Sequence, residues 1–106
     1  MLVRRGPKTA RLENGKYAVD FRYQAARGVK AVYLAGEFNQ WQPTGHPMNG
    51  PDASGLFATR LELPEGIYEY KFVIEGKDWT PDPENIYRVG KHDNSVLWIG
   101  PRTAQE

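Results

Sequence analysis

Cysteine is absent from the 106 residues, and this excludes disulfides, thiolate chemistry and cysteine-based zinc sites. Long hydrophobic runs are also missing, so no segment approaches the length of a transmembrane helix. The basic N-terminus is not followed by the apolar segment of a signal peptide, and we expect a cytoplasmic protein. The charges almost cancel, with a formal net charge of +1, so nothing favours nucleic acid or a membrane as a partner.

Recognisable catalytic arrangements are lacking as well. The two histidines, His46 and His92, fit no metal-ligand spacing, and neither serine lies in a Gly-x-Ser-x-Gly motif. Asp82 stands between two prolines, where a turn-forming side chain is the ordinary role. No glycine loop for phosphate and no coherent calcium loop is present. We therefore predict no catalytic residues, no metal and no cofactor, in a chain that is not an enzyme.

Aromatic residues make up 12% of the chain, and 11 glycines and 8 prolines interrupt the apolar runs. In several segments apolar and polar side chains alternate, as they do in half-buried antiparallel strands. Tyr17, Val19 and Phe21, for example, share one face of such a segment. We expect strands over residues 9–13, 16–24, 29–36, 56–63, 67–75, 85–89 and 94–99.

The number and spacing of these segments predict an all-β fold, an immunoglobulin-like antiparallel β-sandwich of about seven strands. A small β-barrel is the structural alternative. A chain of this length favours one domain, which we expect over residues 9–101. Residues 1–8 are expected to form a flexible basic arm, and residues 102–106 a tail.

Residues 32–41 begin as a strand and end by placing Trp41 on a polar, glycine-rich loop. Trp79 stands in another loop. An indole so placed either covers the core or stacks on a ligand, and the pattern alone leaves both open. Lys71 faces away from the aromatic row of its strand, and Asn94 begins the last strand. This set suits a sugar, whose ring has an apolar face and a rim of hydroxyls.

Four segments together resemble carbohydrate-binding module family 48. They are Leu-Ala-Gly-Glu-Phe-Asn-Gln-Trp at residues 34–41, Leu-Glu-Leu-Pro-Glu-Gly-Ile-Tyr-Glu-Tyr-Lys-Phe-Val-Ile-Glu-Gly at 61–76, Trp-Thr-Pro-Asp-Pro at 79–83 and Asn-Ser-Val-Leu at 94–97. They occur in the family's order and span nearly the whole expected domain. The family includes the glycogen-binding domain of the AMP-activated protein kinase β-subunit and the N-terminal modules of isoamylase-type debranching enzymes and glycogen-branching enzymes.

The resemblance implies a sandwich that binds α-1,4-linked glucans, such as glycogen, starch and maltodextrins, without cleaving them. It implies that Trp41 and Trp79 stack on glucose rings. It further implies that Lys71 and Asn94 form hydrogen bonds with the sugar. All four residue types of the family's glycogen-binding members are kept at these positions.

The chain departs from the kinase-type pattern between residues 87 and 93. Kinase-type members carry a longer loop there, with a leucine and a threonine that embrace the glucan. In this chain the resemblance makes Val89 the candidate to replace the leucine and His92 the candidate to replace the threonine.

An alternative function is a protein-interaction or interdomain packing module with little or no sugar binding. The resemblance implies a partner such as a glycoside hydrolase family 13 catalytic domain or a kinase subunit. Trp98 supports this alternative, because it alternates with Leu97 and Ile99 and would face outward if those two face the core.

Overall fold

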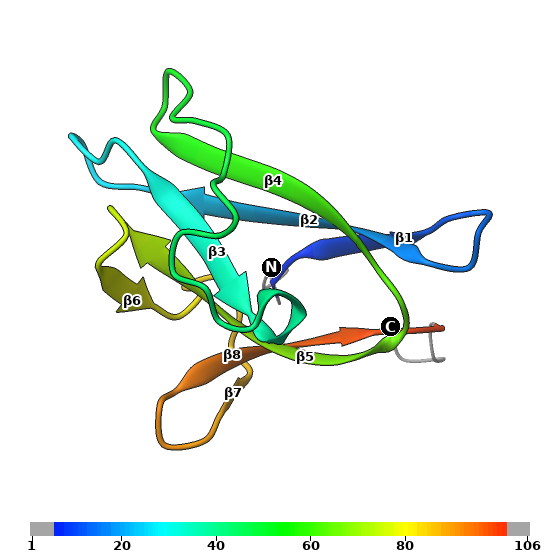
Figure 1. The fold of residues 1–106 in the computed structure, drawn as a ribbon. Helices are drawn as coiled ribbons and strands as arrows, with labels where there is room; N and C mark the ends of the chain where they lie inside the picture. Colours follow the sequence, from blue (N-terminus) through cyan, green and yellow to red (C-terminus); the bar gives the residue numbers. More distant parts are fainter. Residues whose placement is uncertain (1–5, 102–106) are drawn as a thin grey trace.

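Two antiparallel β-sheets face each other across a shared core in the computed structural model, which describes residues 6–101 (Figure 1). Within this range the elements are β1 (Lys8–Arg11), β2 (Tyr17–Gln24), β3 (Val32–Gly36), η1 (Glu37–Asn39), β4 (Leu56–Leu63), β5 (Gly66–Ile74), β6 (Asp78–Thr80), β7 (Arg88–Val89) and β8 (Asn94–Ile99). One sheet has the order β1-β2-β4, and the other has the order β3-β5-β8-β7 with β6 paired to β5. The predicted all-β sandwich is therefore confirmed.

The alternation in β2 explains how the first sheet closes over the core. Tyr17, Val19 and Phe21 are buried, whereas Arg22 is exposed on the outer face. β2 pairs with β4 along its whole length, from Tyr17 opposite Leu63 to Gln24 opposite Leu56. Such a continuous ladder fixes the register, because a slip of one residue would turn every apolar side chain outward.

β5 is the central strand of the second sheet and also carries part of the candidate site. Tyr70 and Phe72 are fully buried in the core, with β3 on one side of the strand and β8 on the other. Lys71 lies between them and points to the opposite face, because successive side chains of a strand alternate. The outer face of this sheet is thus available for a polar surface.

The stretch after β5 differs from the prediction. We expected Trp79 to lie in a loop, but it lies on β6, which pairs with β5 and places Trp79 opposite Val73. A tight turn makes this possible, since Glu75 and Gly76 adopt positive φ values of 55° and 73° and Lys77 N donates to Ile74 O over 3.0 Å. Pro81 then ends the pairing, because proline cannot donate to a ladder.

The described residues, 6–101, include the whole expected domain, 9–101. Residues 1–5 of the expected arm and residues 102–106 of the expected tail lie outside the described residues. β1 already begins at Lys8, and Gly6 N donates to Glu84 O over 3.1 Å. Helical structure within residues 6–101 is confined to the three-residue turn η1, and no helix there could cross a membrane.

Candidate functional site

One cleft gathers five of the six predicted binding residues. Its volume is about 510 Å³, within the usual range for small-ligand sites. Its lining comes from four different parts of the chain and consists of Trp41, Lys71, Trp79, His92 and Asn94. Residues that are far apart in the sequence therefore converge on the outer side of the second sheet.

Trp41 reaches the cleft because the chain turns sharply after β3. Trp41 N donates to Gly36 O over 2.9 Å, which closes the turn formed by η1. Asn39 stabilises this turn, since its Oδ1 accepts from Gly36 N and its Nδ2 donates to Leu34 O, each over 3.1 Å. Gln40 and Trp41 have φ values of 58° and 59°, a backbone conformation that residues other than glycine rarely adopt. The turn thus holds the indole at a defined place.

Gly36 is required where β3 ends. A Cβ atom at this position would lie 2.6 Å from Glu69 O and 2.8 Å from the Phe38 ring. Phe38 instead packs inward, with its ring centroid 5.9 Å from that of Phe21 and 6.3 Å from that of Tyr68. The loop therefore supplies its own core contact and leaves Trp41 at the surface.

Trp79 faces Trp41 from β6. The two ring centroids are 6.3 Å apart, and the ring planes are inclined at 47°. Trp79 is 42% exposed, so its ring is open to solvent. The pair forms two facets of a bent apolar surface, because the inclination prevents the rings from stacking on each other.

Three polar side chains border the two indoles. The Lys71 ammonium donates to the backbone carbonyl of His92. Asn94 Nδ2 donates to Glu69 Oε1 over 2.9 Å, which leaves the amide oxygen to face a ligand. An ammonium, an imidazole and an amide oxygen can together donate to and accept from hydroxyl groups.

Val89 is placed beside the cleft but does not line it. It pairs with Asn94 across the short ladder between β7 and β8 and is 42% exposed. Val89 therefore lies directly opposite Asn94, a lining residue, on the neighbouring strand.

Sequence reasoning missed Glu69, which orients Asn94. The signal was present, because Glu69 and Lys71 are two residues apart on one strand and so share a face. The pairing of Glu69 with Asn94 depends on the register of β5 against β8, which the sequence does not display. Glu69 N donates to Glu37 Oε1 over 3.0 Å.

A second hollow of about 400 Å³ lies over the first sheet. Its lining residues include Lys8, Asp20, Arg22 and Arg60. Two of its cations are already ion-paired: Arg60 with Asp20 over 2.7 Å, and Arg22 with Glu84 over 3.2 Å. It has no exposed aromatic ring, so we regard the cleft between the indoles as the candidate site.

The lining of the cleft favours binding over bond breaking. It contains two indoles, an ammonium, an imidazole and an amide, but no pair of carboxylates facing each other. Within residues 6–101, no three His, Asp or Glu side chains gather as a metal site. The arrangement can hold an apolar ring face against the indoles and hydrogen-bond the polar rim of the same ligand.

Comparison with known proteins defines the family. Residues 12–100 match the family described as the glycogen recognition site of AMP-activated protein kinase. Because the match covers most of the chain, the chain belongs to this family of recognition domains.

Several individual relatives are subunits of a protein kinase. The β-1 subunits of 5′-AMP-activated protein kinase from Rattus norvegicus and Homo sapiens are each 43% identical over 84 residues, which covers 66% of this chain and 28% of the subunit. The β-2 subunit from Mus musculus is 38% identical over 84 residues, covering 68% of this chain and 30% of the subunit. The chain therefore spans less than a third of the length of these relatives.

Solved structures support the fold. Ferric enterobactin esterase from Salmonella typhimurium has a TM-score of 0.72 at 16% identity, covering 89% of this chain and 34% of the esterase. A maltogenic amylase from S. marinus has a TM-score of 0.68 at 23% identity, covering 98% of this chain and 16% of the amylase. At these identities the similarity concerns the fold alone.

Proposed function

We propose that this domain binds α-1,4-linked glucans such as glycogen, starch and maltodextrins, and that it does not cleave them. The observation that carries the proposal is the inclined pair of Trp41 and Trp79 over one cleft, 6.3 Å apart between ring centroids. The family, described as a glycogen recognition site, supports the same substrate class.

Binding divides between the indoles and the polar rim. Trp41 and Trp79 stack on the apolar faces of two sugar rings, and their inclination suits a chain that bends between successive rings. Lys71 and His92 donate to sugar hydroxyls, and the Asn94 amide oxygen accepts from them. The cleft is open to solvent and buries little ligand area, so we expect weak affinity.

The tryptophan fluorescence of the purified chain tests this proposal. Titration with β-cyclodextrin or maltoheptaose should change the signal saturably in the wild type. Trp41→Ala should weaken binding about tenfold or more, since an indole buried by a ligand contributes at least as much as one aliphatic side chain. Trp79→Ala should behave in the same way.

Trp98→Phe is the matched control, because Trp98 is 69% exposed and lies outside the cleft. This variant also removes one tryptophan and should keep the wild-type dissociation constant. A wild type that shows no saturable response, or a Trp41→Ala variant that binds as tightly as the wild type, contradicts the proposal.

A second candidate function rests on a separate observation. Ile67 and Trp98 are 65% and 69% exposed and pair across β5 and β8 on the outer face of the sheet. Two large apolar side chains side by side in solvent mark a surface for packing against another protein. We propose a kinase subunit or a glucan-active catalytic domain as that partner, the first supported by relatives that are kinase subunits.

Co-purification after co-expression with a kinase catalytic subunit tests the packing function. The wild type should retain the kinase subunit, and Trp98→Ser should reduce the yield of the complex several-fold. Equal yields from wild type and variant contradict a role for this surface.

A cytoplasmic location remains a prediction that localisation of the tagged protein would check.

A further inference from the structure

The turn that carries His92 has few backbone contacts of its own. β7 contains only Arg88 and Val89, and two residue pairs join it to β8. The turn over residues 90–93 is closed by Asp93 N, which donates to Gly90 O over 3.2 Å. Gly90 and Asp93 both have positive φ, at 75° and 59°. A hairpin this short is marginal alone, so other contacts must keep its position.

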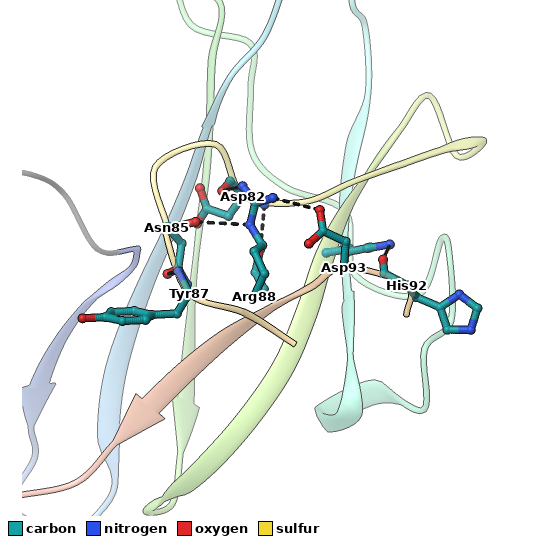
Figure 2. Close-up of polar contacts among 8 residues, drawn as sticks. Asp82, Asn85, Tyr87, Arg88, His92 and Asp93 are labelled. Atoms are coloured by element: carbon teal, nitrogen blue, oxygen red, sulfur yellow. Dashed lines mark hydrogen bonds and ion pairs between the residues drawn. The ribbon is translucent and has the colours of Figure 1, made fainter. Parts of the chain in front are cut away.

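Arg88 supplies such contacts in three directions (Figure 2). Its Nη1 is ion-paired with Asp93 Oδ2 over 3.1 Å, which ties the start of the hairpin to the end of the turn. Its Nη2 donates to Asp82 O over 3.0 Å. Its Nε donates to Asn85 O over 3.3 Å. The guanidinium thus joins the turn to the segment that precedes β7.

That preceding segment is firmly anchored. Asp82 is 2% exposed and Asn85 is fully buried. Tyr70 OH donates to Asp82 Oδ2 over 2.7 Å, and Asn85 Nδ2 donates to Tyr70 OH over 3.1 Å. Asn85 Nδ2 also donates to Val96 O over 2.8 Å. Buried polar groups that satisfy one another in this way form a rigid base.

The turn is therefore held from two sides. Arg88 is ion-paired with Asp93, while the Lys71 ammonium donates to the carbonyl of the neighbouring His92. Figure 2 shows the His92 ring pointing away from Arg88, on the far side of the turn. His92 and Asn94, which both line the cleft, flank Asp93 directly in the chain.

We propose that Arg88 is a positioning residue for ligand binding: it fixes the turn so that His92 and Asn94 stand at a set distance from the two indoles. The proposal rests on glucan binding by the cleft as argued above. Arginine suits this role, because its planar group presents several donors at fixed angles to acceptors on different segments. A lysine ammonium has its donors on a single nitrogen and could not reach all three acceptors, which contact three different guanidinium nitrogens.

Glucan titration of Arg88→Gln and Asp93→Asn tests the proposal. Asp93 is 61% exposed and Arg88 32% exposed in their side chains, so the ion pair is a surface one. We expect Asp93→Asn to weaken maltoheptaose binding up to about fivefold, the limit for such a pair. Arg88→Gln, which loses all three ties, should weaken it up to about tenfold. Arg88→Lys should recover only a small part of the loss.

Arg22→Gln is the matched control. Like Arg88, Arg22 is an ion-paired arginine that contacts the segment before β7, since its Nε donates to Glu84 Oε1 over 3.2 Å. It does not touch the turn, so its replacement should leave glucan affinity unchanged.

A double-mutant cycle separates positioning from general stabilisation. If Arg88 acts through the turn, Arg88→Gln should have much less effect on affinity in a background that carries both His92→Ala and Asn94→Ala than in the wild type. An equal effect in both backgrounds overturns the proposal. Asp93→Asn keeps the test available if Arg88→Gln fails to fold, since it leaves the Arg88 contacts to Asp82 and Asn85 intact.

The outcomes also distinguish the two proposals. A wild type without glucan binding overturns the proposed function and this inference together. A wild type that binds, alongside Arg88→Gln and Asp93→Asn variants with unchanged dissociation constants, overturns the positioning role and leaves the proposed function standing.

Discussion

Tyr70 shows how a single polar group is accommodated inside this sandwich. Its ring is fully buried, and its hydroxyl lies between the carboxylate of Asp82 and the amide of Asn85. Burial, together with the negative charge of Asp82, raises the pKa of the Tyr70 phenol far above its usual range. The phenol is therefore neutral at every ordinary pH and keeps the proton that it donates to Asp82.

Tyr70→Phe should destabilise the protein by about 1–3 kcal/mol, because it removes a donor from a buried acceptor. Urea unfolding followed by tryptophan fluorescence measures the change. Tyr23→Phe is the control, since Tyr23 packs at the edge of the core and is only partly buried. Equal stability of Tyr70→Phe and the wild type would show that the hydroxyl contributes nothing net.

Residue-level reasoning succeeded where direction along a strand decides the outcome. Lys71 faces the cleft because its neighbours Tyr70 and Phe72 face the core, and alternation makes this visible in the sequence. The contact between Trp41 and Trp79 was not visible in this way. It depends on the path of two loops, and the expectation that both act together came from a family resemblance.

At the scale of whole elements, ionic contacts join the strands of the first sheet. Lys8, Asp20 and Arg60 lie opposite one another on β1, β2 and β4. Arg60 donates to both carboxylate oxygens of Asp20, over 2.7 Å and 3.1 Å. This hydrogen bonding lowers the pKa of Asp20 in the folded state, and desolvation opposes it only in part.

The lowered pKa gives a pH-dependent contribution to stability. The contribution is present above the unfolded-state pKa of Asp20, about 3.9, and is lost as the pH falls through the lower folded-state value. Between about pH 5 and pH 2, where Asp20 becomes protonated, Asp20→Asn should therefore lose slightly less unfolding free energy than the wild type. The difference should be small, because the side chains of both partners are well exposed.

Urea unfolding at a series of pH values measures this dependence. Glu62→Gln is the control, since Glu62 lies on the same β4 strand but outside the ion pair. High salt should reduce the difference between wild type and Asp20→Asn, because screening weakens exposed charges. Identical pH dependence in the two proteins would contradict a favourable interaction of Arg60 with Asp20.

Prediction of the elements was good for the long strands and missed one short strand, β6. β2, β4 and β8 match their expected ranges closely, since each displays the two-residue period. β6 has three residues and stands before two prolines, so no periodicity could reveal it. It forms because the turn after β5 returns the chain along an existing strand edge, and this is a tertiary effect.

At the scale of the whole molecule, the core that stabilises the sandwich and the cleft lie on opposite faces of the second sheet. The core between the sheets holds the apolar rows of β2, β4 and β5, while the cleft lies on the outer side of the second sheet. The residues that line the cleft lie in the turn after β3, in β5, in β6 and in the hairpin that leads into β8. A site assembled from so many segments exists only when the chain is folded.

Glucan should therefore stabilise the folded state, because a site absent from the unfolded chain makes the ligand bind one state only. At a maltoheptaose concentration about ten times Kd, the gain is about 1.4 kcal/mol. For a domain of this size that corresponds to a rise in Tm of about 5–10 °C. Thermal unfolding followed by circular dichroism, with and without maltoheptaose, measures the shift.

Two controls isolate binding from a general solvent effect. Sucrose at the same mass concentration reports stabilisation by exclusion from the surface, which requires no site. Beyond the sucrose effect, the Trp41→Ala and Trp79→Ala variants should gain at most about 0.4 kcal/mol from the same maltoheptaose concentration, since binding about tenfold weaker leaves each near its own Kd. If the cleft binds the glucan, loss of either indole must reduce the rise in Tm. An equal rise in Tm for wild type and both variants would mean that the stabilising contact lies elsewhere on the molecule.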